Sequence, residues 1–103
     1  MIKVTPQAVE KLNHLLREHP EENCVRVRIT DLGEDRRVFH ITLEEAFQPG
    51  DQVQESYDLT IGIPEEDAQL MEGATLDYDE TEGFKVQHPN SEENGDHDPF
   101  QLN

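Results

Sequence analysis

Sulfur and aromatic residues are scarce in this 103-residue chain, which has one cysteine, no tryptophan, four phenylalanines and two tyrosines. The single thiol, Cys24, cannot form a disulfide within the chain, as is usual for a reducing compartment. No apolar run approaches the roughly 18 residues of a membrane helix, and the first residues lack the apolar stretch of a secretory signal. We therefore expect one soluble, cytoplasmic domain.

Basic residues are also few. The chain has 8 Lys and Arg against 24 Asp and Glu, a formal net charge of -16, and after residue 50 its only lysine or arginine is Lys85. Nucleic acids and anionic lipids bind proteins through Lys and Arg, so neither is an expected direct partner. We expect instead a protein partner with a basic patch. We also expect a monomer, because two bodies of this charge repel each other.

Catalytic and cofactor motifs are missing as well. There is no Gly-rich phosphate loop, no Gly-x-Ser-x-Gly elbow and no His-Glu-x-x-His pair. Adjacent carboxylates such as Glu65 and Glu66 are typical of a solvated acidic face unless an apolar pocket surrounds them. His14 and His19 are five residues apart, roughly 140° around a helix, so they cannot share a metal ion. We predict a protein that is not an enzyme, holds no cofactor and has no dedicated metal site.

The apolar residues recur with periods that predict one helix followed by short strands. Thr5 and Pro6 form a helix start signal, and the helix should end before Pro20. Cys24 should begin a strand, and period-two alternation predicts strands over 25–30 and 38–43 joined by a wide loop over 31–36. Further segments over 53–63, a short helix over 64–71, and strands over 74–79 and 84–88 follow. The prediction is a mainly β structure of mostly antiparallel strands with an amphipathic N-terminal helix.

The domain division follows from where this periodicity stops. Residues 1–90 carry all the predicted helices and strands, so they form the domain. Residues 91–103 show no periodicity and are rich in acidic and small polar residues, so we expect a flexible acidic C-terminal tail.

Three segments resemble one family in order and spacing. They are VTPQAVEKL (4–12), GATLDY (73–78) and Pro89-Asn90. Together they resemble the A-type iron-sulfur carriers, the HesB-like family that includes IscA and SufA, over nearly the whole chain. The resemblance implies a compact, barrel-like sandwich of short strands with the N-terminal helix packed on it. It also implies a site built on three cysteines, one in a Gly-Cys-Ser-Gly loop and two in a Cys-Gly-Cys segment near the C-terminus.

None of these three cysteines is present here. Glu34 stands where the first thiolate would be, and residues 94–98 read Asn-Gly-Asp-His-Asp where the other two would be. Iron-sulfur clusters are held chiefly by thiolates, so the cluster-carrying role does not transfer with the resemblance. What the resemblance implies instead is an accessory or regulatory role, as in the cysteine-lacking relatives linked to dissimilatory sulfur oxidation.

Two functions remain open. The first is a non-catalytic binding module that docks on its partner through the acidic half, with the mixed-charge hairpin loop as a second contact. The candidate partner-binding residues are Glu34, Asp35, Arg36, Arg37, Asp77, Asp79 and Glu80. The alternative is an oxygen-ligand iron or divalent-metal binding protein in which Glu34 joins Asp96, His97 and Asp98. An iron-sulfur carrier that uses Cys24 from two subunits is the least favoured reading.

Overall fold

The computed structural model describes residues 1–34, 36–87 and 100–101. The elements in this part of the chain are β1 (Lys3–Val4), α1 (Pro6–Glu18), β2 (Cys24–Gly33), β3 (Arg36–Glu44), β4 (Asp51–Ser56), β5 (Leu59–Pro64), α2 (Glu65–Ala68), β6 (Thr75–Asp79), β7 (Gly83–Gln87) and β8 (Phe100–Gln101). No helix among these residues is long and apolar enough to cross a membrane.

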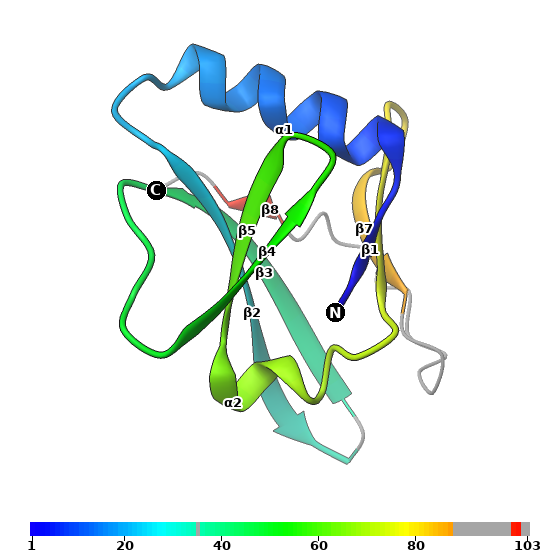
Figure 1. Ribbon diagram of the computed structural model, residues 1–103. Helices are drawn as coiled ribbons and strands as arrows, with labels where there is room; N and C mark the ends of the chain where they lie inside the picture. Colours follow the sequence, from blue (N-terminus) through cyan, green and yellow to red (C-terminus); the bar gives the residue numbers. More distant parts are fainter. Residues whose placement is uncertain (35, 88–99, 102–103) are drawn as a thin grey trace.

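The strands form two sheets that face each other (Figure 1). The larger has the order β4-β5-β2-β3-β8 and the smaller the order β1-β6-β7. The β2–β3, β4–β5 and β6–β7 pairs are antiparallel, whereas the parallel pairs β1–β6, β2–β5 and β3–β8 share only two register positions each. Both sheets are therefore mixed and mostly antiparallel, and the predicted fold class is confirmed.

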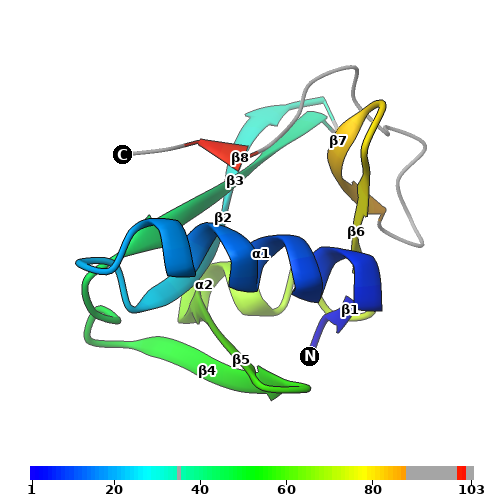
Figure 2. The same cartoon turned by 90° about the horizontal axis from the view of Figure 1, so that it is seen from above.

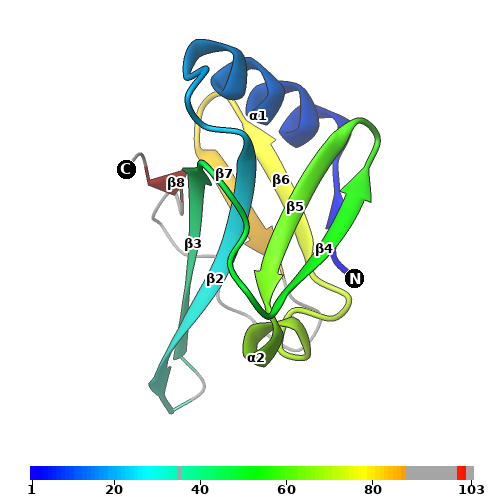
Figure 3. The ribbon, with the colours of Figure 1, turned by 60° about the vertical axis from the view of Figure 1, so that its left-hand side comes forward.

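The N-terminal helix starts and ends where its sequence signals place it. The Thr5 hydroxyl accepts a 3.2 Å hydrogen bond from the amide of Ala8, and Pro6 occupies the first turn, where its missing N–H costs nothing. The last helical residue is Glu18, just before Pro20. Figure 2 shows α1 lying across the strands, and Figure 3 shows α2 at the opposite end of the molecule from α1.

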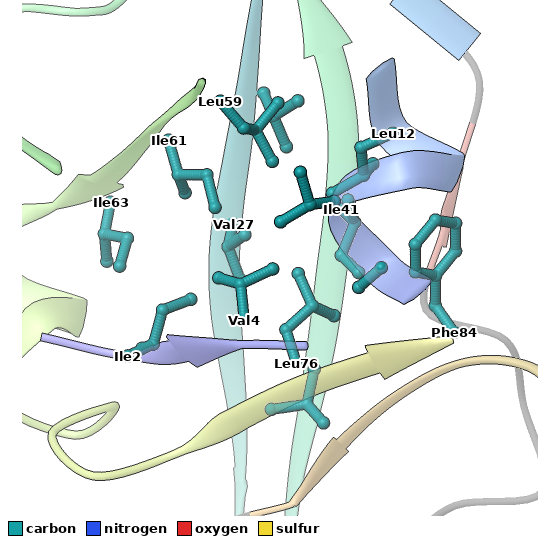
Figure 4. Packing of buried hydrophobic residues seen from close by; sticks show 14 of the residues in the cluster. Ile2, Val4, Leu12, Val27, Ile41, Leu59, Ile61, Ile63, Leu76 and Phe84 are labelled. Carbon is teal, nitrogen blue, oxygen red and sulfur yellow. The ribbon is translucent and has the colours of Figure 1, made fainter. Parts of the chain in front are cut away.

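The core lies between the two sheets and α1 (Figure 4). Val27 and Ile41 are register partners on β2 and β3, so their side chains point to the same face, and both are at most 1% exposed. Leu12 reaches this core from α1, Leu76 from β6 and Phe84 from β7. The apolar residues at alternate positions of β2 and β3 therefore lie in the core, as the period of two predicts.

The β2–β3 hairpin is longer and tighter than predicted. Strand β2 continues to Gly33 and β3 begins at Arg36, so the prediction of a wide loop over 31–36 is wrong. The register is irregular between Asp31 and Gly33, and the φ angles are positive at Gly33 (82°) and Glu34 (55°). This geometry turns the chain in fewer residues than the six of the predicted loop. The hairpin consequently projects beyond the sheet as a two-stranded ribbon (Figure 3).

The remaining differences concern short elements. Helix α2 ends at Ala68 rather than Met71, and turns lead from there to Gly73, where φ is 84°. The two-residue strands β1 and β8 were not predicted, because a period of two cannot be read from two residues. Strand β8 lies within the predicted tail and pairs with β3, whereas residues 88–99 and 102–103 are outside the described residues.

Candidate functional site

The tip of the β2–β3 hairpin holds Glu34, the residue predicted to stand where the resemblance places the first family cysteine. Glu34 is exposed and has left-handed backbone geometry, and the preceding amide of Gly33 donates to the Asp31 carboxylate at 2.8 Å. Arg36 is exposed and Arg37 half-buried on the returning strand. The hairpin tip therefore offers a carboxylate oxygen, a hard ligand, and no thiolate.

The predicted oxygen-ligand metal site is not assembled by the described residues. Within them, no group of three His, Cys, Asp or Glu side chains comes close enough together to hold a metal ion. Asp96, His97 and Asp98, which the alternative reading joins to Glu34, lie outside the described residues, as does Asp35 of the docking set.

The acidic end of β6 is built onto the start of α1. The carboxylate of Asp77 accepts hydrogen bonds from the Thr5 hydroxyl at 2.7 Å and from the amide of Tyr78 at 2.8 Å. Asp79 accepts from the amide of Thr81, and this bond is the main cause that holds the pKa of Asp79 below its ordinary value. Asp77 thus has a structural task, whereas Asp79 and the adjacent Glu80 are exposed.

This acidic end lies in a groove with a basic opposite wall. The groove, about 760 Å³ in volume, runs between α1 and the 77–81 segment, and α1 contributes Lys11, His14 and Arg17 to it. The ammonium of Lys11 lies 5.4 Å from the ring centre of Tyr78, within cation–π range. The surface at this end therefore presents acidic residues of 77–80 opposite a wall of α1 that carries Lys11 and Arg17 together with Glu10.

The two predicted contact sets lie at opposite ends of the molecule. The hairpin tip projects at the same end as α2, while the turn after β6 lies beside the start of α1 (Figures 1 and 3). A single compact partner patch cannot include both Glu34 and Glu80. The structure thus separates the candidate docking residues into a hairpin set and an acidic-strand set.

A buried ion pair that the sequence did not indicate lies on the outer face of the large sheet. Arg26 alternates with Val25 and Val27 and is only 8% exposed, and its guanidinium donates two 2.8 Å hydrogen bonds to the carboxylate of Asp51. Asp51 also accepts from the amide of Gln48, and Glu44 accepts from the Thr42 hydroxyl and lies 3.4 Å from Arg26. These bonds, chiefly that from Arg26, hold the pKa of Asp51 below its ordinary value, and Asp51 raises the pKa of Arg26.

Next to this ion pair lies a second groove, which we call the outer groove. It has a volume of about 630 Å³ and is bounded by β2 and β3, by residues 48–51 and by residues 64–67. Arg28, Thr30 and His40 line it from the sheet, and the ring Nε2 of His40 is 3.0 Å from the Thr30 hydroxyl. The sequence indicates this groove only through Arg26 and Arg28, which alternate on β2 in an otherwise acidic chain. That alternation predicts that both arginines share one face of the strand, but not that other segments cover this face.

The only thiol is placed as a structural group. Cys24 opens β2 as predicted, is 3% exposed, and donates from Sγ to the carbonyl of Glu44 at 3.3 Å. Burial, followed by the nearby charge of Glu44, raises the pKa of the thiol. Cys24 is therefore a poor nucleophile and a poor metal ligand in the folded chain.

Comparison with solved structures agrees with this architecture. The structure of IscA with a [2Fe-2S] cluster matches with a TM-score of 0.75 and 23% identity, over 90% of this chain and 89% of that one. Escherichia coli SufA, described as involved in biosynthesis of iron-sulfur clusters, matches with a TM-score of 0.78 and 19% identity, over 88% of this chain and 82% of that one. A protein from Aquifex aeolicus solved by NMR matches with a TM-score of 0.67 and 27% identity, over 85% and 91%.

Comparison by sequence gives the family. No curated protein matches the chain. The model of the family described as "Iron-sulphur cluster biosynthesis" matches residues 1–95, which include both sheets apart from β8. Because this match spans most of the chain and the fold agrees with those of IscA and SufA, the chain belongs to the iron-sulphur cluster biosynthesis family of A-type carriers.

Proposed function

We propose that this chain is a non-catalytic accessory or regulatory protein that has the A-type carrier fold without the cysteine ligands and acts by binding a protein partner. One observation carries the proposal: the exposed hairpin tip, where the resemblance expects the first thiolate, holds Glu34, and the only thiol, Cys24, is 3% exposed and hydrogen-bonded to the carbonyl of Glu44. A carrier needs thiolates that can reach a cluster and release it.

The docking surface that we propose is the acidic end of β6, with the hairpin tip as a separate second contact. Asp79 and Glu80 are exposed there, and the second half of the chain holds most of the acid. A partner with a basic patch would be steered to this end, and a Debye length of ~8 Å at physiological salt implies that the complex weakens as salt rises. Asp77 belongs to the same surface but also supports Thr5.

The proposal also covers the pathway in which this chain acts and its oligomeric state. Relatives that lack the family cysteines include DsrR, an accessory protein of dissimilatory sulfur oxidation, and we infer a comparable cytoplasmic role for this chain. We also infer a monomer, because the missing ligands remove the reason to share a cluster between subunits and the net charge of -16 opposes self-association.

Anaerobic reconstitution tests the loss of the carrier role. The pure protein is incubated with iron and sulfide beside a three-cysteine A-type carrier treated identically, and absorption, bound iron and gel filtration are recorded. We expect this chain to stay colourless, iron-free and monomeric while the carrier gains its chromophore. A stoichiometric chromophore together with a dimer would overturn the proposal.

Capture at low salt tests the docking surface. We expect a partner retained by the wild-type protein to be lost from the variant Asp79→Asn/Glu80→Gln and released by added salt. The matched control is Glu45→Gln/Glu55→Gln, which removes the same charge from exposed residues outside both proposed contacts. Equal binding by the two variants, or binding indifferent to salt, would show that the acidic end of β6 is not the docking surface.

A further inference from the structure

The outer groove contains an arginine that has no partner among the described residues. Arg28 is half-buried, and its Nε atom is buried and makes no hydrogen bond to any described residue. Its register partner across β2 and β3 is His40, so the two side chains share the outer face. Arg37 also has an unpaired Nε, but it pairs with Asp31 in register and therefore points to the opposite face.

Two of the four acidic side chains that line the groove, Asp51 and Asp67, already have partners. Asp51 binds Arg26 through both oxygens, and Asp67 accepts a 3.0 Å hydrogen bond from the amide of Ile29. A buried donor without an acceptor is unfavourable and calls for an explanation. In a chain with 24 carboxylates, a guanidinium whose buried Nε has no acceptor beside a cavity is the feature to be explained.

We propose that the outer groove binds a carboxylate group, which accepts hydrogen bonds from the guanidinium of Arg28 and lies against His40 and Thr30. A carboxylate is planar and matches the donor fork of a guanidinium with two parallel hydrogen bonds. Its single charge also suits the groove, because Glu65 and Glu66 stand exposed at the rim and repel a group as highly charged as a phosphate. The same rim favours a ligand that carries a positive charge farther along.

This inference goes beyond the proposed function and does not depend on it. The proposed docking surface is at the β6 end, whereas the outer groove lies beside α2 at the opposite end (Figure 3). A small carboxylic acid and the free C-terminus of a peptide both offer the required group. Apolar side chains in the groove wall, Ile29, Pro49 and Pro64, give an extended peptide more to contact than they give a small acid.

The test follows the Nε–H resonance of Arg28 by NMR in the full chain. N-acetylglycine is titrated at constant ionic strength set with sodium chloride, and N-acetylglycinamide, which lacks the carboxylate, is the matched neutral ligand. We expect a saturable downfield shift with the acid and none with the amide. A peptide with a free C-terminus that binds about tenfold more tightly than N-acetylglycine identifies a peptide as the occupant, and equal affinities identify a small acid.

Two variants make the test specific to Arg28. Affinity should fall at least about tenfold in Arg28→Gln, because a hydrogen-bonded charge pair is lost, and should be unchanged in Arg17→Gln, which removes an exposed arginine of α1. Arg28→Lys, which keeps the charge but not the fork, should show intermediate affinity and serves if the glutamine variant does not fold. Absence of a saturable shift in the wild type, or equal affinity in the glutamine and wild-type proteins, overturns the proposal.

Discussion

The side chain of Gln54 binds the main chain of Ile2 as a neighbouring strand would. Its Nε2 donates to the Ile2 carbonyl and its Oε1 accepts from the Ile2 amide, both at 3.0 Å. Gln54 lies on β4, at the edge of the large sheet, and Ile2 directly precedes β1, at the edge of the small sheet. Since Gln54 is only 8% exposed, the two sheets are joined by a buried pair of hydrogen bonds.

Replacing this amide should loosen the joint between the sheets. Gln54→Leu keeps a side chain of similar size but leaves the amide and the carbonyl of Ile2 without partners. We expect the free energy of unfolding, measured by urea denaturation, to fall by about 2 kcal/mol or more. Gln52→Leu, an exposed position on the same strand, should change it by less than about 0.5 kcal/mol. Equal effects of the two substitutions would contradict the role of the paired hydrogen bonds.

The ion pair between Arg26 and Asp51 should make stability depend on pH. Asp51→Asn removes the carboxylate and leaves the guanidinium buried, so we expect a loss of about 3 kcal/mol at neutral pH. The folded-state pKa of Asp51 is lowered by Arg26, so its contribution is complete above the unfolded-state pKa and disappears as pH falls through the folded-state value. The difference between wild type and variant should therefore narrow in acid.

Denaturation curves recorded from neutral pH down into the acid range check this behaviour. Glu55→Gln removes one exposed carboxylate from the same strand and is the charge-matched control, with an expected change of less than about 0.5 kcal/mol. A difference between wild type and Asp51→Asn that stays constant as pH falls would mean that the pair contributes through shape rather than charge.

The sequence predicts which face of a strand a residue occupies, but not what covers that face. Alternation with Val25 and Val27 puts Arg26 on the face away from the core, but it does not show that this face is covered. The segment before β4 folds back over this face and brings Asp51 to Arg26. That covering depends on contacts between residues 25 positions apart, which no local period encodes.

The two candidate sites also differ in how far the sequence predicts them. The place of Glu34 could be predicted from the sequence, because the break between two alternating segments puts it in the connection between β2 and β3. The outer groove could not, because it forms only when residues 48–51 and 64–67 close around β2 and β3. The separation of the hairpin set from the acidic strand likewise follows from the topology of the two sheets and not from either segment alone.

The segment before β4, which covers Arg26, packs against the sheet through the ring of Phe47, which lies on Gly62. A Cβ atom at Gly62 would clash with the ring of Phe47, approaching Cε1 to 2.8 Å, and would lie 3.2 Å from Asp51 Oδ2. We expect Gly62→Ala to lower the free energy of unfolding by about 2 kcal/mol through overpacking. Because Phe47 is the side chain that must move, Phe47→Ala should relieve part of this cost, and a double-mutant cycle measures the coupling. Strictly additive effects would contradict the contact.

The burial of Cys24 predicts a thiol that the folded protein withholds from solution. A raised pKa leaves less thiolate at any given pH, and burial blocks the approach of a reagent, so native protein should react with a disulfide reagent far more slowly than protein unfolded in guanidinium. The control variant Cys24→Ala/Glu34→Cys moves the only thiol to the exposed hairpin tip, where it should react immediately. Both proteins have a single thiol in the same fold, so the ratio of their reaction rates measures the effect of the thiol's position alone. A fast reaction of native wild-type protein would put a thiolate within reach of iron, and would remove the strongest argument against a cluster in this member of the family.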